Sequence, residues 1–548
     1  MSTPPFKKSN LIPIPSQVSE LRGIIRSHSL PSLTLLSRSQ NVVDNAPLEL
    51  ARYAIEIQTL EETLGKLKSE RALLESYADE CRSLFSPARR LPTELLVEIF
   101  DLCSPDFNSV DNTTTVEQEE TRLAKIYLLR LSQVSFRWHD IVMNSPKLWS
   151  TITFDTTLWH KSTISSATLL AMLASSLKRG ADFPLALEAA IDHDHSDSNH
   201  ESVLPLLAQH SRRWKTVYLW VYPPRLRFLA QARGNLPILE SLTLVSASAN
   251  LQPTGAVDMF GVAPRLKTAE VHGWWGPLPW GQLLRLTIAN GQVTNVNGRR
   301  RMLSLAMLPL LSNEIRCTLL VLPAGINLPL GLQRATSNIP SLEIGFSSEE
   351  NRLDGITYLT RTGKILGEIF AALSLPSLSH LRVFRSLRDG LPPAWNAPRF
   401  LDFASRSMLC NTLRSFEVYS VVTDVELLES LVVLPLLEEL KVGDCAYMDH
   451  EHITITDNLL HQLSWRSDQA NLVPHLRVLS LVTLGAFTEE SFLEFASSRI
   501  VPGRSDAGPF TANISEAAST SRKFSVDFFV KLETLEEERE LRFDYFYA

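Results

Sequence analysis

Cysteines are few and scattered in this 548-residue chain. Its five cysteines, Cys81, Cys103, Cys317, Cys410 and Cys445, form no CxxC pair and no other spacing typical of metal ligands. This distribution argues against a disulfide framework or a zinc site and favours a reducing compartment. We therefore expect no metal or cofactor, and a cytoplasmic or nuclear location.

The chain also lacks an excess of positive charge and long apolar runs. Its formal net charge is -7, so it has no basic field of the kind that nucleic acids or anionic membranes attract. The longest apolar runs, LLAMLASSL and MLSLAMLPLL, are shorter than the roughly 20 residues that span a bilayer, and the N-terminus has no secretory signal. We expect neither nucleic acid nor membrane as a partner.

Sequence motifs of catalysis are missing as well. There is no GxSxG, no phosphate-binding GxxxxGK[ST], no GxGxxG followed by an acidic residue and no catalytic cysteine signature. The stretches DHDHSDSNH (192–200) and DHEH (449–452) have residue types that bind metals, but they are short, polar and match no metal-site spacing; we interpret them as solvated loops. The sequence predicts a protein that is not an enzyme, with a catalytic C-terminal region as the remaining alternative.

The N-terminal part divides into a tail and a heptad segment. Residues 1–45 are rich in Ser, Pro and Asn without periodicity, which predicts a disordered tail. Residues 46–86 predict a helix that packs on its own protein or forms a coiled coil with itself or another helix. Two series of residues with a spacing of seven occupy the two core positions of the heptad. The first series is Leu50, Ile57, Leu64, Arg71, Ala78 and Phe85, and the second is Tyr53, Leu60, Leu67, Leu74 and Cys81.

Residues 87–150 predict three short helices. In LPTELLVEIF (91–100), the proline suits a first helical turn and the apolar residues recur at helical spacing. A polar loop follows at 104–121, and then two further helical stretches run up to PKLW (146–149). So small a helical domain would gain stability from a partner.

These helices resemble an F-box, in particular the fungal F-box-like type with a preceding heptad helix. LPTELLVEIF, the spacing of Val134 and Trp138, and PKLW carry the resemblance, while the insert at 104–121 departs from the compact form. The resemblance implies a surface that docks on the Skp-family adaptor of cullin-RING ubiquitin ligases; the alternative is an ordinary helical core. The residues in or beneath that surface would be Leu91, Pro92, Leu95, Leu96, Ile99, Phe100, Val134 and Trp138.

Residues 151–505 carry a loose repeat of Pro-x-Leu followed by a short alternating strand. It occurs in LPILESLTL (236–244), APRLKTAEV (263–271), IPSLEIGF (339–346), LPSLSHLRV (375–383), LPLLEELKV (434–442) and VPHLRVLSL (473–481), while WKTVYLWV (214–221) and LRSFEVYS (413–420) fit the strand half. The interval 271–339 has room for one or two degenerate units. The pattern resembles irregular leucine-rich repeats, whose units bury their leucines against neighbours; a compact α/β domain with parallel strands is the alternative.

The predicted fold is therefore multi-domain: an all-α N-terminal part with a heptad helix and a three-helix F-box, an α/β leucine-rich-repeat-like solenoid over 151–505, and a C-terminal cap or tail over 506–548. The predicted function is that of a substrate-recognition adaptor of an SCF-type ligase, with a Skp-family protein, a cullin and a protein substrate as partners. The alternative is a scaffold outside ubiquitylation. The tryptophans of HGWWGPLPWG (272–281) are candidate anchors for the substrate, or else fold down onto the repeat core. Arg212, Arg213, Arg225 and Arg227 are candidate phosphate contacts, or else ordinary surface charge.

Overall fold

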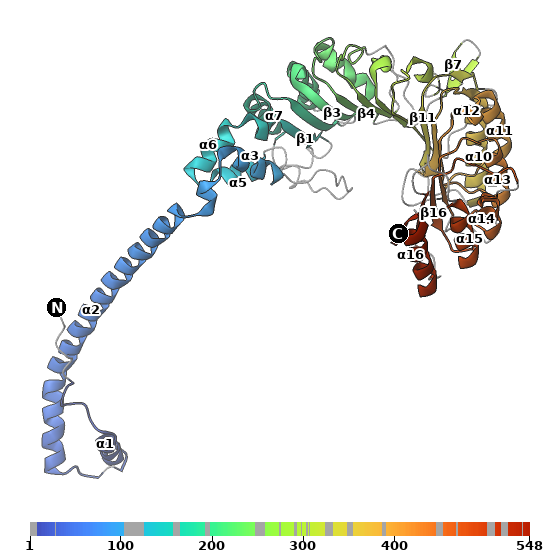
Figure 1. Ribbon diagram of the computed structural model, residues 1–548. Helices are drawn as coiled ribbons and strands as arrows, with labels where there is room; N and C mark the ends of the chain where they lie inside the picture. Colours follow the sequence, from blue (N-terminus) through green and yellow to red (C-terminus); the bar gives the residue numbers. More distant parts are fainter. Residues whose placement is uncertain are drawn as a thin grey trace. The chain divides into compact units, whose positions relative to one another are not determined.

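The computed structural model in Figure 1 forms two compact units, residues 1–96 and 97–548. Among its described residues there is no helix with both the length and the apolarity to cross a bilayer. The described residues are 8–27, 29–103, 125–156, 165–191, 198–246, 258–272, 276–289, 293–296, 299–302, 305, 307–323, 332–347, 355–385, 391–444, 453–466, 469–500, 510–516, 524–539 and 541–547.

The first unit contains helices α1 (Pro15–Ser27) and α2 (Leu33–Leu84) and the 3-10 turn η1 (Pro87–Arg90). Ser32 starts α2, because its hydroxyl accepts a hydrogen bond from the backbone N–H of Leu35 at 3.3 Å and so satisfies a donor that the helix leaves free. Helical structure therefore lies within 1–45, where the sequence predicted a disordered tail. The content of Ser, Pro and Asn suggested disorder, but one of those serines is the cap that starts the helix.

The second unit begins with short helices. They are the latter part of α3 (Thr93–Leu102), α5 (Ile126–Ser132), α6 (Phe136–Asn144) and the 3-10 turn η2 (Pro146–Trp149). The hydroxyl of Ser135 accepts a hydrogen bond from the backbone N–H of Trp138 at 3.2 Å and caps α6. The indole N–H of Trp149 donates to the carbonyl of Val142 at 2.8 Å and fixes η2 against the end of α6. The expected helical N-terminal part is thus confirmed.

A sheet of fourteen strands follows, and all its pairings are parallel. Neighbouring strands in the sheet follow chain order from one edge to the other. The strands are β1 (Thr151–Asp155), β2 (Leu185–Ile191), β3 (Trp214–Val221), β4 (Ser241–Ser246), β5 (Thr268–His272), β6 (Arg285–Ala289), β9 (Cys317–Pro323), β11 (Ser341–Ser347), β13 (His380–Arg385), β14 (Ser415–Val418), β15 (Glu439–Gly443), β16 (Val478–Thr483), β17 (Phe510–Glu516) and β18 (Leu541–Tyr547).

Every predicted strand motif coincides with a strand of this sheet, and the interval 271–339 contains two more, β6 and β9. Two short pairs lie outside the sheet: antiparallel β7 (Val293–Val296) with β8 (Arg299–Met302), and parallel β10 (Ala335–Thr336) with β12 (Leu373–Ser374). The predicted strand-rich C-terminal region with a long parallel sheet is confirmed.

Helices and 3-10 turns connect the strands. In Figure 1, α10, α11, α13, α14 and α15 lie along one side of the strands, and the helices and this face of the sheet share one apolar core. The connections include α7 (Ser166–Arg179), α8 (Ser198–Gln209), η4 (Ser211–Arg213), η5 (Pro223–Ala232), η6 (Trp280–Gln282), η7 (Leu308–Leu310), α10 (Gly355–Ala372), α11 (Ala397–Arg406), α12 (Leu409–Thr412), α13 (Asp424–Val432), α14 (Asp457–Leu463), α15 (Glu489–Arg499) and α16 (Val526–Arg539).

In three places an arginine later in the chain contacts the C-terminal end of a helix. The last carbonyls of a helix have no hydrogen-bond donor within the helix. At the ends of three helices, the guanidinium of an arginine 36 residues further along the chain donates to such a carbonyl. Arg213 donates to Leu177 at the end of α7, Arg406 to Phe370 at the end of α10, and Arg499 to Leu463 at the end of α14. We call these three residues the joining arginines.

Candidate functional site

The apolar residues of α3 lie on two faces of the helix. Leu95 and Ile99, one turn apart, are 51% and 42% exposed, whereas Leu96 and Phe100 are 1% and 0% exposed. The predicted adaptor-binding residues of α3 therefore divide into two that reach solvent and two that are buried within this protein. Of the four, Leu95 and Ile99 are the two placed to touch a partner.

The residues that lead into α3 are accessible in part. Leu91 is half-buried and Pro92 is exposed. The carbonyl of Pro92 accepts a hydrogen bond from the backbone N–H of Leu96 at 3.2 Å, which begins the helical hydrogen-bond pattern. The proline thus stands where its missing N–H is no loss.

The turn between α5 and α6 presents further apolar surface. Val134 is 62% exposed, and the neighbouring Trp138 is half-buried, with its ring 4.8 Å from the ring of Phe100 and tilted by 59°. Trp138 thus packs on the core of the helical domain with part of its surface open. Sequence reasoning missed Leu102 and Phe136, which are 86% and 88% exposed.

Ion pairs and one buried lysine hold these helices together. The ammonium of Lys147 lies 2.5 Å from Glu98 and 3.4 Å from Asp101 on α3. Lys125, just ahead of α5, is buried and donates to the carbonyl of Leu148 at 2.7 Å. Burial lowers the pKa of Lys125 to about 8, although the charge of Asp101 acts to raise it. The predicted insert at 104–121 lies outside the described residues.

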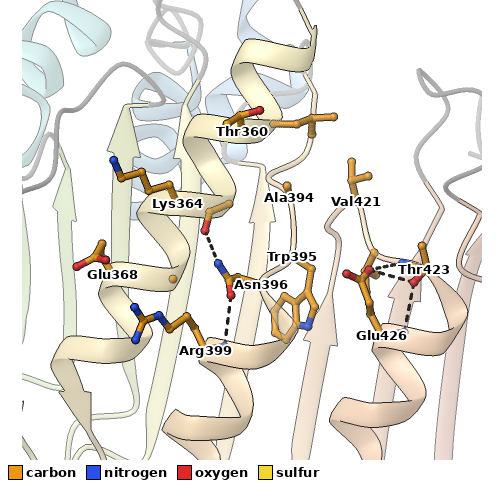
Figure 2. A pocket seen from close by; sticks show the side chains of 14 residues that line it. Thr360, Lys364, Glu368, Ala394, Trp395, Asn396, Arg399, Val421, Thr423 and Glu426 are labelled. Carbon is orange, nitrogen blue, oxygen red and sulfur yellow. Dashed lines mark hydrogen bonds between the residues drawn. The ribbon is translucent and has the colours of Figure 1, made fainter. Parts of the chain in front are cut away.

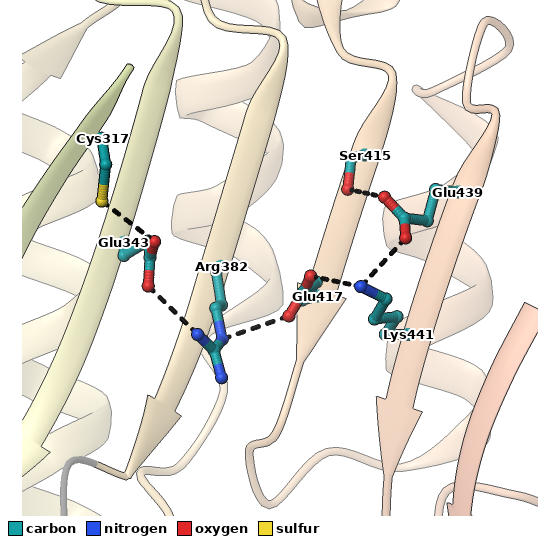
Figure 3. Close-up of polar contacts among 7 residues, drawn as sticks. All are labelled: Cys317, Glu343, Arg382, Ser415, Glu417, Glu439 and Lys441. Atoms are coloured by element: carbon teal, nitrogen blue, oxygen red, sulfur yellow. Dashed lines mark hydrogen bonds and ion pairs between the residues drawn. The ribbon is translucent and has the colours of Figure 1, made fainter. Parts of the chain in front are cut away.

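The face of the sheet opposite the helices carries a row of charges (Figure 3). Glu343, Arg382, Glu417 and Lys441 occupy register-matched positions on β11, β13, β14 and β15. Arg382 lies 3.2 Å from Glu343 and 3.1 Å from Glu417, and Lys441 lies 2.9 Å from both Glu417 and Glu439. We call these five residues the charged row.

The ion pairs of the charged row shift the acid strength of its members. Burial alone would lower the pKa of Lys441, but its hydrogen bonds to Glu417 and Glu439 raise that pKa above its usual value. Burial would raise the pKa of Glu439, yet hydrogen bonds from Ser415 and Lys441 bring it below its usual value. At the end of the row, burial and the Glu343 carboxylate raise the pKa of the Cys317 thiol to about 12, so this cysteine stays protonated.

Towards the other edge of the sheet the same face combines acidic and aromatic residues. Glu188 on β2 lies beside Tyr218 on β3 in the register, and Glu270 on β5 lies 2.8 Å from the Nε2 atom of His272. Burial, and then the charges of Glu188 and Glu270, raise the pKa of Tyr218. This part of the face offers a half-exposed phenol between carboxylates.

A pocket of about 630 Å³ opens on the helix side, between α10, α11 and α13 (Figure 2). The side-chain amide of Asn396 donates to the carbonyl of Gly363 at 3.2 Å, and its oxygen accepts from the backbone N–H of Arg399 at 3.3 Å. A Cβ atom on Gly367 would lie 2.6 Å from the Asn396 amide nitrogen, so the glycine permits this close approach. Thr423 and Glu426 form a capping box at the start of α13. These polar groups hold the walls of the pocket.

The structure corrects one suggested phosphate contact and leaves other candidates untested. Arg213 is 7% exposed and its guanidinium donates to backbone carbonyls, so it cannot receive a phosphate. Trp280 is buried as the first residue of η6, whereas Trp274 and Trp275 lie outside the described residues. Residues 192–197 and 449–452, from the two His/Asp stretches, also lie outside them, and the described residues contain no metal-binding cluster.

A comparison with protein families finds a match in the helical domain. The F-box-like family model matches residues 88–155. The chain is also similar to a chain in the crystal structure of the Rad7 and Elc1 complex of yeast, with 15% identity and a TM-score of 0.24, over 67% of this chain and 95% of that one. It matches none of the curated proteins with which it was compared. Residues 88–155, with α3, α5, α6 and η2, are therefore an F-box-like domain.

Proposed function

We propose that this chain is a non-catalytic substrate-recognition adaptor of an SCF-type cullin-RING ubiquitin ligase, acting in the cytoplasm or nucleus. The F-box-like domain at 88–155 carries the proposal, since F-boxes as a family dock on Skp-family adaptors. Exposed Leu95, Ile99 and Val134 supply apolar anchors of the kind that dominate such interfaces. The chain would raise the effective concentration of a target near the ubiquitin carrier, and its partners would do the chemistry.

The C-terminal region fits the second half of this role. Its parallel strands in unbroken chain order, most of them followed by a helix or 3-10 turn among the described residues, support an irregular leucine-rich-repeat-like solenoid. A doubly wound α/β domain would instead reverse its strand order at a switch point. We propose that the face bearing the charged row, Tyr218 and Trp220, which lies two residues after Tyr218 on β3, captures the protein target.

The docking step is tested by co-purification of the tagged full chain with the Skp-family adaptor and cullin of its host. We expect Leu95→Asp/Ile99→Asp to lose at least about tenfold of the bound adaptor, because each buried carboxylate would lack a partner. A matched control is Val425→Asp/Val432→Asp on α13, whose side chains are 56% and 67% exposed. This control should retain both partners.

The same experiment separates the proposal from its rival. Retention of the Skp-family adaptor without cullin would favour a scaffold outside ubiquitylation. If the folded wild-type chain retains neither protein, the docking proposal fails.

A further inference from the structure

Helix α2 has a long apolar face that the first unit leaves open. None of its 52 residues, all of which the structure describes, is buried. The heptad positions of its central part are more than half exposed: Ile57 is 54%, Leu60 54%, Leu64 51%, Leu67 58% and Leu74 67% exposed. We call these five residues together with Arg71 the heptad seam. A stripe of this kind is stabilised when a second helix covers it.

A parallel pair of identical helices fits the heptad seam badly. In that arrangement Arg71 would meet Arg71 of the second copy within the seam. The flanking positions would bring Glu56 to Glu61 and Glu70 to Glu75, each twice by symmetry, and like charges at this spacing repel. A parallel homodimer therefore has repulsion both in its centre and along its edges.

An antiparallel pair centred between Gly65 and Lys66 removes every one of these conflicts. The seam becomes self-complementary, and the register continues outward to Leu50 opposite Cys81 and Tyr53 opposite Ala78. Arg71 then faces a leucine, and its guanidinium can keep its ion pair with Glu75 of its own helix, 2.9 Å away. The seam contacts are Ile57 with Leu74, Leu60 with Arg71, and Leu64 with Leu67 of the second copy.

The flanking charges agree with this register. Glu61 of each copy lies beside Lys68 of the other, so two pairs of opposite charge form. The remaining flanking pairs contain no like charges. They are Ala54 with Glu75, Thr63 with Glu70, and Glu56 with Tyr77.

We propose that α2 pairs with α2 of a second copy of this chain, antiparallel and centred between Gly65 and Lys66, to form a homodimer. The inference is independent of the ubiquitin-ligase role, because it rests on charge and exposure within the first unit alone.

Sedimentation equilibrium of the full chain tests the dimer and its direction together. Glu61→Lys places one lysine beside Lys68 of the other copy, twice by symmetry, in the antiparallel arrangement and should weaken the dimer about tenfold. Glu61→Lys/Lys68→Glu restores opposite charges and should restore the wild-type Kd. The matched control is Glu62→Lys, one residue along on the outward face, which should leave the Kd unchanged.

Other outcomes overturn the proposal. Wild-type chain that remains monomeric at high concentration rules out the dimer. Tighter association of Glu61→Lys indicates the parallel arrangement, in which Glu61 faces Glu56. Mild oxidation gives a second readout: a disulfide between the Cys81 residues of two copies requires parallel helices, where this position faces itself, and would contradict the antiparallel register.

Discussion

At the scale of single residues, Lys125 combines an unusual backbone with a buried charge. Its φ of 47° lies in the left-handed region, and its ammonium donates to Leu148 in the interior of the helical domain. The pKa in the folded chain is about 8, against an ordinary value of 10.5. Between these values the unfolded chain binds more protons, so the contribution of Lys125 to stability rises with pH; below about pH 8 the penalty for burying the charge is fully present.

We therefore expect Lys125→Met to change the pH dependence of stability. Between about pH 7.5 and pH 10, the free energy of unfolding of the wild type should rise relative to that of the variant by about 2 kcal/mol. Urea titrations of both proteins across this range measure the difference. Two parallel curves would show that Lys125 has an ordinary pKa in the folded chain.

What the sequence could predict is clear at this scale. Helical spacing placed Leu95, Leu96, Ile99 and Phe100 on one broad apolar face, but it could not divide them into exposed and buried pairs, because that depends on which neighbours pack on α3. Lys125 gave no signal at all, since a lysine beside an apolar run ordinarily lies at the surface.

At the scale of elements, the joining arginines tie η4, α11 and α15 to the ends of the earlier helices α7, α10 and α14. Arg499 is 2% exposed and donates to the carbonyls of Leu463, Leu472 and Val473. Its loss would leave these acceptors buried without their partner, and such groups are costly to leave unsatisfied.

Arg499→Met should lower the free energy of unfolding of this part of the chain by about 3 kcal/mol. Hydrogen exchange should report the loss of protection first in α14, whose last carbonyls Arg499 holds. Arg477→Met, at an exposed position on the same stretch of chain, is the control and should change protection little. Equal effects of the two substitutions would contradict the role given to Arg499.

The elements were predictable to different degrees. The Pro-x-Leu motifs identified their strands, because alternating aliphatic residues after a turn are a strong local signal. The strands β6 and β9 lack such a motif, so the sequence predicted only that the interval 271–339 has room for one or two degenerate units. The joining arginines stayed hidden, because a spacing of 36 residues has meaning only once the helix ends are known.

At the scale of the whole molecule, the last strands cover one end of the sheet. β17 pairs with β16, and β18 pairs with β17. Aromatic contacts join this end to the helices before it: the rings of Phe495 and Phe510 lie 5.7 Å apart, and those of Phe492 and Phe528 5.9 Å apart. This end of the sheet thus depends on residues 510–547.

Truncation after residue 505 should expose the edge of β16 together with Phe492 and Phe495. Exposed strand edges and apolar patches promote association between chains, so light scattering should detect aggregates that the full chain does not form. Deletion of residues 1–32, which lie in the other compact unit, is the control and should leave the sheet region unaffected. A monodisperse truncated chain with full protection of β16 would contradict this prediction.

The order of strands in the whole sheet could not be predicted from the sequence. Repeats of unequal spacing fit both a compact α/β domain and an extended array, because buried parallel strands look alike in either. The hydrogen-bonded register across fourteen strands distinguishes an unbroken order from a reversed one, and no local pattern carries that information.

The charged row limits what a bound protein could gain from ionic contacts. Glu417 already lies against both Arg382 and Lys441, so an incoming ammonium or carboxylate would exchange one ion pair for another, with little net change in free energy. Affinity at this part of the sheet would then respond weakly to ionic strength. Discrimination between ligands would then depend on two aromatic rings, each two residues further along the chain than a member of the charged row. Phe384 lies beneath the guanidinium of Arg382, and Tyr419 lies beside Gly443.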